Sequence, residues 1–231
     1  MDTKNTTRVA LITGGSAGLG LALTRALAAE GWRVITDGRS EEKFKEADLP
    51  DGVTTIVGDL TDADHREGLR VEVERAGRLD LLVHNASTLG PLLMKELEEV
   101  DIADLTQVWR TNIGSPLVLT STLLPWLREA DGVLLSISSD AAVNHYETWG
   151  LYGASKAALD HVTLTYGAET GLTAYAVDPG DMRTAMHQDA FPGEDISDRP
   201  LPETVVPHLL ALIEQRPETG RYRAADLRGD V

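Results

Sequence analysis

Short apolar runs alternate along the chain with longer segments in which apolar residues recur every three or four positions. An unbroken apolar run is typical of a strand buried on both faces, whereas the longer period is typical of a helix packed on one side. The pattern predicts strands over residues 9–12, 34–35, 53–57, 79–83, 133–137 and 172–177, and another after Gly220. It predicts helices over residues 19–29, 62–76, 102–127, 151–168 and 202–215.

The order of these elements predicts the fold class. Strands separated by helices form parallel crossover units, and successive units build a doubly wound sheet covered by helices on both faces. We therefore expect an α/β fold of the Rossmann type with about seven parallel strands. Residues 1–231 are expected to form a single domain, because no internal repeat or linker rich in proline, glycine or serine divides them.

One late stretch departs from the alternation. Residues 189–202 are rich in proline, and the interval 185–202 around them is expected to be either a short flap over a substrate or an ordinary surface loop. A flap this brief leaves a site fairly open, which favours a compact substrate over a deeply engulfed one.

Charge and composition narrow the partners. The chain has 37 acidic and 21 basic residues and a net charge of −16, which repels nucleic-acid phosphates and anionic lipids. Residues 1–8 are polar and lack the apolar core of a secretory signal, and residues 113–127 are too short and too interrupted to span a bilayer. We expect a cytoplasmic protein that binds neither nucleic acid nor membrane.

The absence of cysteine excludes several kinds of chemistry. With no cysteine, disulfides, thiol catalysis and iron–sulfur ligation are impossible. The six histidines show no helical spacing of four with an acid between them, so no metal is expected.

A glycine-rich segment joins the first predicted strand to the first predicted helix. It runs from Thr13 to Gly20 with the sequence TGGSAGLG. Such a loop lets the backbone approach a pyrophosphate held on the helix N-terminus, although an ordinary glycine-rich turn is the alternative.

A second pattern brings together a serine, a tyrosine and a lysine. Ser139 precedes Tyr152 by thirteen positions, and Lys156 follows it by four. On a helix, residues four apart share a face, so the lysine ammonium comes near the phenol. A charge at about 5 Å is worth roughly 3 kcal/mol, or about two pKa units, which predicts a phenol usable as an acid or base near neutral pH.

Together these segments resemble the short-chain dehydrogenase/reductase family in its short single-domain form. The resemblance covers almost the whole chain. It implies that Tyr152 exchanges a proton with a carbonyl or alcohol oxygen while hydride passes to or from nicotinamide C4. It implies further that Ser139 binds the same oxygen, in preference to Ser138, and that Asn112 holds a water in a relay through Lys156. A helix-kinking or capping role is the alternative for Asn112.

The resemblance also implies a set of cofactor contacts. His84 stands where the family commonly has an asparagine, which leaves the contacts at the end of the fourth strand open. The expected cofactor-binding residues are Thr13, Gly14, Ser16, Gly18, Leu19, Gly20, Gly38, Arg39, Asp59, Leu60, Asn85, Ala86, Tyr152, Lys156, Pro179, Gly180, Met182 and Thr184.

The end of the second strand indicates which cofactor is used. Gly38 occupies the position where NAD-dependent relatives carry an acid, and Arg39 follows, where a basic residue pairs with a 2′-phosphate. NADP(H) is therefore favoured over NAD(H). A register shifted by one residue makes Asp37 the ribose ligand and favours NAD, and Arg39 is then a solvated charge balancing Glu41 and Glu42.

The predicted function is an NAD(P)-dependent oxidoreductase, a carbonyl reductase or alcohol dehydrogenase acting on a small molecule. The alternative is a catalytically silent dinucleotide-binding regulatory protein. Either form is expected to be a homodimer or homotetramer, and Trp109 and Trp126 are expected in the core or at a subunit contact. Candidate substrate contacts are His145, Tyr146, Trp149, Met186 and His187.

Overall fold

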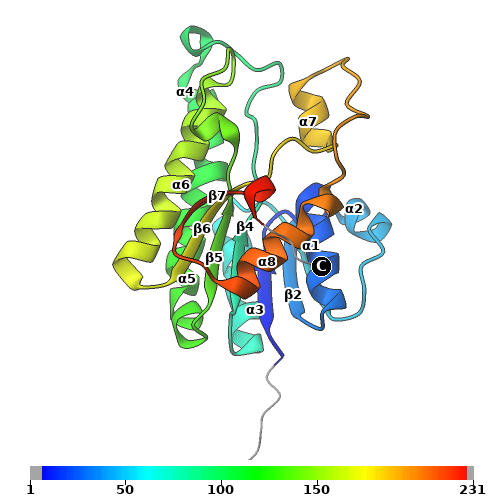
Figure 1. The fold of residues 1–231 in the computed structure, drawn as a ribbon, viewed down its shortest axis with the longest axis vertical. Coiled ribbons are helices and arrows are strands. Elements are labelled where there is room, and N and C mark those ends of the chain that lie inside the picture. The colour runs from blue at the N-terminus through cyan, green and yellow to red at the C-terminus, as the bar shows by residue number, and fades with distance from the viewer. Residues whose placement is uncertain (1–6, 228–231) are drawn as a thin grey trace, which may run out of the picture.

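A single parallel sheet of seven strands forms the centre of the computed structural model, which describes residues 7–227 (Figure 1). The strands are β1 (Val9–Ile12), β2 (Arg33–Gly38), β3 (Val53–Val57), β4 (Leu81–His84), β5 (Val133–Ile137), β6 (Thr173–Asp178) and β7 (Gly220–Arg223). Their order is β3-β2-β1-β4-β5-β6-β7, and every neighbouring pair is parallel. The predicted doubly wound sheet is confirmed, with its switch point between β1 and β4.

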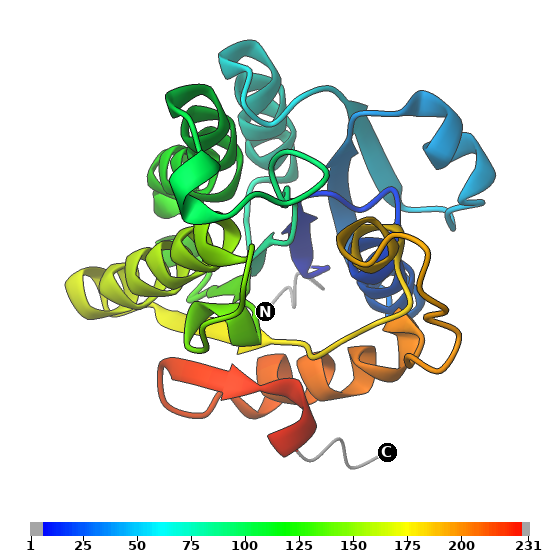
Figure 2. The same ribbon diagram turned by 90° about the horizontal axis from the view of Figure 1, so that it is seen from above.

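Helices cover both faces of the sheet (Figure 2). The α-helices of the described residues are α1 (Gly18–Ala29), α2 (Glu41–Glu46), α3 (Ala63–Ala76), α4 (Ile102–Trp109), α5 (Ser115–Glu129), α6 (Gly150–Thr170), α7 (Ala185–Ala190) and α8 (Val206–Gln215). Seen from above, α1 and α8 lie on one side of the sheet, and α3, α5 and α6 lie on the other side. Within residues 7–227, no helix combines the length and apolar character that crossing a membrane requires.

Two apolar cores follow from the alternation of side chains along each strand. On β1, Ala10 and Ile12 pack with α1 and α8, whereas Val9 and Leu11 pack with α3 and α5. All four β1 side chains are therefore buried, which explains why the strand reads as an unbroken apolar run rather than an alternating one.

Three differences from the predicted elements have local causes. The predicted helix 102–127 is two helices joined by a π-helical turn over Arg110–Gly114, where the Ser115 hydroxyl donates to the Arg110 carbonyl at 2.8 Å. Helices α2 and α7 were not predicted, because six residues are too few to show a period. Strand β2 extends to Gly38, through polar residues whose backbone pairs with β3.

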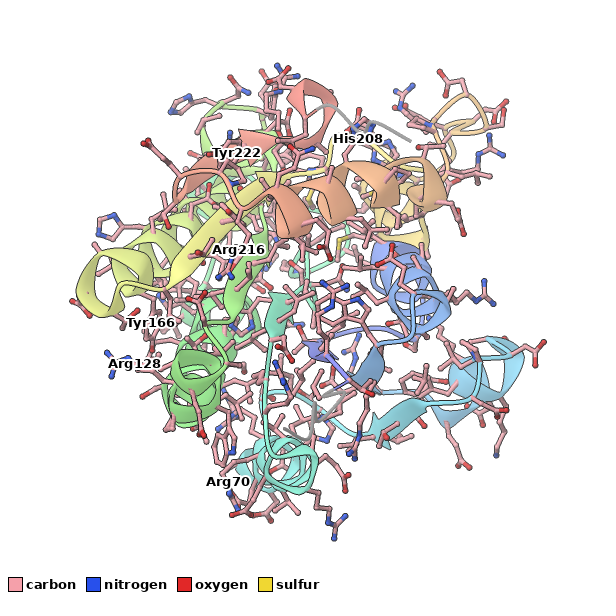
Figure 3. All side chains as sticks on the ribbon, turned by 60° about the horizontal axis from the view of Figure 1, so that its bottom comes forward. Arg70, Arg128, Tyr166, His208, Arg216 and Tyr222 are labelled. Carbon is pink, nitrogen blue, oxygen red and sulfur yellow. The ribbon has the colours of Figure 1, made fainter. Side chains whose placement is uncertain are left out.

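The amino-terminal end of the sheet is held by polar contacts (Figure 3). Arg216, at the end of α8, donates to Asp131 at 2.9 Å. The Tyr166 hydroxyl of α6 donates to the Leu117 carbonyl of α5 at 2.9 Å. These contacts support the scaffold, whereas ligands of such sheets bind at the opposite, carboxyl ends of the strands.

Candidate functional site

A cavity of about 920 Å³ opens at the carboxyl ends of the central strands. Most residues predicted for cofactor binding or catalysis line it: Gly14, Ser16, Gly18, Leu19, Gly38, Arg39, Asp59, Leu60, Asn85, Ala86, Ser139, Tyr152, Lys156, Pro179, Gly180, Met182 and Thr184. Segments far apart in the sequence thus meet at the switch point, as the fold requires.

The glycine loop forms one wall of this cavity. Gly14 has a φ of +72°, and a Cβ there would come within 3.0 Å of the Ala86 Cα. Gly18, the first residue of α1, has a φ of +55°. The preceding residue, Ala17, offers no side-chain cap, so the first N–H groups of α1 have no such partner. Free helical N–H groups beside a glycine backbone fit an anionic phosphate.

Two residues predicted to contact the cofactor instead support the loop from behind. The buried Thr13 hydroxyl accepts the N–H groups of Asn85 and Ala86, each at 3.1 Å. The Asn85 amide donates to the carbonyls of Thr13 and Gly14 at 2.9 and 3.1 Å. A Cβ at Gly20 would collide with this amide at 2.4 Å. Thr13 and Gly20 therefore fix the loop against β4 and lie outside the cavity lining.

The end of β2 separates an internal acid from an exposed base. Asp37 is 2% exposed, and its two oxygens accept from the Gly14 N–H at 2.7 Å and face His65 Nε2 at 2.9 Å. Its carboxylate is thus engaged inside the protein. Arg39 is exposed at the cavity wall, and within residues 7–227 no ion pair engages it. In the alternative interpretation, Arg39 balances the charge of Glu41. In the structure, Glu41 pairs with Lys45 at 2.8 Å.

His84 turns away from the glycine loop. Its Nε2 lies 2.6 Å from the Thr120 hydroxyl of α5, and burial lowers the pKa of the imidazole to about 3. The side chain is therefore neutral and joins β4 to α5. His84, which stands where the family commonly has an asparagine, therefore contributes packing. The adjacent Asn85 holds the glycine loop.

Ser139, Tyr152 and Lys156 come from two neighbouring elements. Tyr152 and Lys156 lie one turn apart on α6, with the Lys156 Nζ 5.6 Å from the centre of the Tyr152 ring. Lys156 donates to the Ile137 carbonyl at 2.8 Å, which anchors it to the end of β5. Just beyond that strand, the Ser138 hydroxyl donates to Asp160 at 2.8 Å and the Ser139 hydroxyl donates to Asp140 at 3.1 Å. The two serines thus point to different partners.

Burial governs the titration of the tyrosine and the lysine. It raises the pKa of Tyr152 above its ordinary range, and the nearby hydroxyls of Ser139 and Ser87 act in the opposite direction. It lowers the pKa of Lys156 to about 8, which Asp160 partly opposes. The expected lowering of the Tyr152 pKa by Lys156 is therefore wrong for the protein without ligands, because desolvation of the phenol outweighs it. Tyr152 is protonated at neutral pH and is suited to donating a proton.

Asn112 lies in the π-helical turn and is completely buried. Its oxygen accepts from the Thr88 N–H at 2.9 Å and the Ser87 hydroxyl at 3.2 Å. Its amide donates to the Thr88 carbonyl and the Ser155 hydroxyl, both at 2.9 Å. All four side-chain hydrogen-bonding positions are used, so the side chain has no group left for a relay water. The structural alternative, a residue that fixes the kink, fits these contacts.

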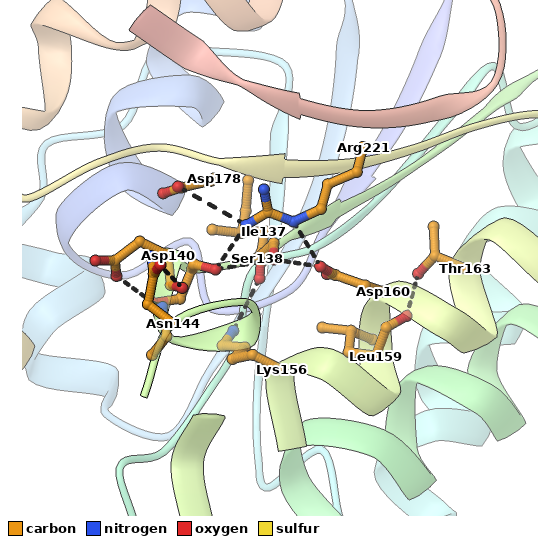
Figure 4. A network of polar contacts seen from close by, with 12 residues as sticks. Ile137, Ser138, Asp140, Asn144, Lys156, Leu159, Asp160, Thr163, Asp178 and Arg221 are labelled. Atoms are coloured by element: carbon orange, nitrogen blue, oxygen red, sulfur yellow. Dashed lines mark hydrogen bonds and ion pairs between the residues drawn. The ribbon is translucent and has the colours of Figure 1, made fainter. Parts of the chain in front are cut away.

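An ion network lies behind the candidate catalytic side chains (Figure 4). Arg221 of β7 donates to Asp160 of α6 at 3.0 Å and to the Ser139 carbonyl at 2.8 Å. Asp178 lies 3.8 Å from the same guanidinium. Burial raises the pKa of Asp160, which is 7% exposed, so its charge depends on these donors. Nothing in the sequence pattern indicated Arg221.

We expect Arg221→Met to destabilise the protein by about 2–3 kcal/mol, because it leaves the buried Asp160 carboxylate without its cation. Urea unfolding at neutral pH measures this change, and Arg223→Met, at an exposed position of the same strand, is the control. The loss should shrink as the pH falls, because protonation of Asp160 removes the unpaired charge. Equal stability of the two variants would contradict the role given to Arg221.

Two predicted cofactor contacts, one after β6 and one after β3, have additional structural duties. Thr184 caps α7, its hydroxyl accepting from the His187 N–H at 3.1 Å. At the other end of the cavity, Asp59 accepts the Thr61 N–H at 2.8 Å, which lowers the pKa of its carboxyl. Both residues still line the cavity, so each holds its loop in shape while facing the ligand space.

The candidate substrate contacts divide into two groups. Trp149, Met186 and His187 line the cavity. His145 and Tyr146 are exposed outside it, and the Tyr146 hydroxyl donates to Asp140 at 2.7 Å. The structure adds cavity residues that the sequence did not single out: Lys43, Ser87, Thr88, Arg110, Asp140, Asp181 and Asp189. Ser87, Asp140 and Asp181 each lie three positions after a strand end, which was the signal available.

Comparison with known proteins places the chain in a family. A family model described as short chain dehydrogenase matches residues 8–195. Benzil reductase ((S)-benzoin forming) of Saccharomyces cerevisiae is 32% identical over 195 residues, covering 79% of this chain and 74% of the relative. The oxidoreductase YciK of Escherichia coli is 32% identical over 229 residues, covering 92% and 89%.

Solved structures agree with these matches. The YciK structure superposes with a TM-score of 0.86 at 29% identity and covers 97% of this chain and 98% of its own. A Shigella flexneri protein, classed with the short chain dehydrogenases and solved with NADP, gives a TM-score of 0.86 at 29% identity, covering 94% and 97%. The matched region includes the glycine loop and the Tyr152–Lys156 pair. The chain therefore belongs to the short chain dehydrogenase family.

Proposed function

We propose that the protein is an NADP-dependent oxidoreductase that transfers a hydride between nicotinamide C4 and a carbonyl or secondary-alcohol carbon. One observation carries the proposal: a single cavity is lined by a glycine cradle at one side and by Ser139, Tyr152 and Lys156 at another. Two relatives give support, since one is a benzil reductase and another was solved with NADP.

The residues of this cavity fit a dinucleotide. The glycine backbone and the uncapped N–H groups of α1 suit the pyrophosphate, and the absence of a side chain at Gly14 lets this backbone pack closely on Ala86 and Asn85. Lys156 would hold the nicotinamide ribose, and Thr184 and Met182, which also line the cavity, would border the nicotinamide. The nicotinamide supplies or accepts the hydride when it is bound.

Each catalytic side chain has a defined task in carbonyl reduction. Tyr152, kept protonated by burial, donates its proton to the carbonyl oxygen. Ser139 hydrogen-bonds the same oxygen and stabilises the charge that develops on it. Lys156 is a positive group beside the phenol and offsets the negative charge left there. Oxidation of an alcohol uses the same groups in reverse.

The test is loss of NADPH absorbance when the purified protein meets ketones, aldehydes and quinones. Turnover that needs both NADPH and a carbonyl compound supports the proposal. Tight NADPH binding with no turnover of any carbonyl or alcohol would instead favour the cofactor-sensing alternative. Isothermal titration with NADPH separates that result from a failure to bind cofactor.

Preference for NADP is assigned to Arg39. Because the Asp37 carboxylate is occupied by Gly14 and His65, the register with Gly38 and Arg39 at the ribose is the supported one. A charge-assisted contact to the 2′-phosphate is worth roughly 1.5–3 kcal/mol. Arg39→Ala should therefore raise the KM for NADP(H) about tenfold or more and barely change that for NAD(H). Arg33→Ala, at the other end of β2, is the control. A wild-type preference for NAD would overturn the assignment.

We also propose that residues 185–202 act as a short flap. The interval begins with α7, whose residues Ala185, Met186 and His187 line the cavity, so it is more than a loop. Its far end is tied back by the Arg183 N–H, which donates to the Pro200 carbonyl at 2.8 Å. The flap thus joins the cavity wall at one end and the scaffold at the other.

Self-association is proposed from the outer face of α4 and α5. Ile102, Leu105, Trp109, Leu117 and Val118 are exposed there. Such apolar side chains gain from burial against a second copy. Trp126, by contrast, packs at the border of the α3–α5 core. Light scattering should give the mass of a dimer or tetramer, and a monomer at micromolar concentration would contradict this.

A further inference from the structure

Aromatic rings gather beside the proposed proton donor. Trp149 stands one turn before Tyr152 on α6, and their ring centres are 5.7 Å apart at an angle of 76°. Phe191, just after α7, lies 5.7 Å from the Trp149 ring at 39°. The whole chain has only four tryptophans, five tyrosines and two phenylalanines. A large share of its ring surface is therefore concentrated where the carbonyl must bind.

Apolar side chains complete this part of the wall. Leu89 is buried with Tyr152 in a small cluster, and Met186 and Ala190 pack against it together with Trp149. All of these residues line the cavity. Thioether and aromatic groups gain from contact with a flat ring, both by burying its surface and by edge-to-face attraction.

Ionisable groups divide the cavity into two unlike ends. Arg39, Lys43 and Arg110 line the end near β2 and β3 together with Asp37 and Asp59, and Arg110 donates to the Thr61 carbonyl at 3.4 Å. Asp140 and Asp189 line the aromatic end, and Asp140 is held at 2.7 Å by Tyr146, whose ring packs on Trp149. Lys156 is the cation closest to the phenol, and it is buried and bonded to Ile137. An anionic group on the substrate would face carboxylates here.

We propose that the substrate is an uncharged aryl ketone or aldehyde whose ring lies against Trp149, on which Phe191 packs from outside the cavity lining. The inference rests on the proposed function and specifies its substrate class. The carbonyl carbon gains hydride from NADPH and the oxygen gains the Tyr152 proton, which yields the aryl carbinol and NADP⁺. Carbonyl compounds bearing a carboxylate on the ring are disfavoured by Asp140.

Two matched pairs of compounds test the ring and the charge separately. The first is 1-phenylethanone against 1-cyclohexylethanone, and the second is methyl 4-acetylbenzoate against 4-acetylbenzoate. In kcat/KM, Trp149→Leu should lower the phenyl-to-cyclohexyl ratio by about fivefold to tenfold, because it removes the ring contact. Phe191→Leu, outside the cavity lining, should lower the ratio less, because it only loosens Trp149. The ester should be preferred over the acid by about 100-fold, and Asp140→Asn should cut that preference by at least about tenfold. His145→Ala, exposed and outside the cavity, should leave both ratios unchanged.

A binding measurement separates this inference from the proposed function. Saturation-transfer NMR with Tyr152→Phe protein and NADP⁺ should detect the phenyl ketone, with the signal reduced by Trp149→Leu. That result without turnover in the wild-type protein would refute the proposed function and support the aromatic site. Equal ratios and equal binding for phenyl and cyclohexyl compounds, with turnover intact, would refute the aromatic site alone. Loss of both turnover and phenyl-ketone binding would refute the proposed function and the aromatic site together.

Discussion

Replacing Tyr152 by phenylalanine should lower kcat by at least about 1,000-fold while NADP(H) affinity stays within a few-fold of wild type. The change keeps the ring, which is 7% exposed and packs against Leu89 and Ala141, and removes only the hydroxyl. General acid catalysis typically contributes 10²–10⁴-fold, and no other described group at this wall has a proton as well placed for the carbonyl oxygen.

Steady-state kinetics in the reduction direction measure this effect, with isothermal titration giving the cofactor affinity. Tyr166→Phe is the matched control, because it removes a hydroxyl from a tyrosine on the same helix that lies outside the cavity lining. Retention of more than about a tenth of the wild-type kcat would refute the role of Tyr152. Since burial raises the pKa of this phenol, the wild-type reduction rate should not fall through loss of its proton between pH ~6 and pH ~9.

Local spacing accounts for what could be predicted of the site. Tyr152 and Lys156 are four positions apart, and the glycine loop is continuous, so their geometry follows once the helix and strand are recognised. Three central strands were predictable for a related reason: β1, β4 and β5 are buried at every position, which leaves an apolar run in the sequence, whereas the edge strand β3 has no fully buried residue. Even the seventh strand, with a polar composition of Gly-Arg-Tyr-Arg, followed from its position in the alternation.

Long-range partners account for what could not be predicted. Arg221 reaches Asp160 across 61 positions, and Asp37 meets His65 across 28, with no local pattern that links either pair. The roles of two predicted residues depended on such partners. The Asn112 side chain is saturated by Ser87, Thr88 and Ser155, and the raised pKa of Tyr152 follows from its burial. Spacing identifies which groups meet, but burial and partner count decide what each can do.

The second large effect is expected at Lys156. Lys156→Met should lower kcat for alcohol oxidation by at least about 100-fold near neutral pH, because a charge 5.6 Å from the ring centre is worth about 3 kcal/mol of phenolate stabilisation. That figure corresponds to about two pKa units, so part of the lost activity should return as the pH rises. Lys156→Arg, which keeps the charge, should retain more activity than Lys156→Met. An oxidation profile with the wild-type midpoint would contradict the electrostatic role.

The stability of Lys156→Met should rise although its activity falls, which distinguishes a catalytic defect from misfolding. Burial lowers the pKa of Lys156 from 10.5 to about 8 in the folded protein. Between these values the unfolded chain binds more protons, so this group makes stability rise with pH and costs about 3 kcal/mol below pH ~8. Lys156→Met removes that cost, and the cofactor-free variant should unfold at higher urea than wild type at pH ~7 and lose the extra slope between pH ~8 and ~10. Lys45→Met, at an exposed lysine, should show neither change. A variant that is both inactive and less stable than wild type would mean that the lysine holds the end of β5 in place, through Ile137, more than it serves the phenol.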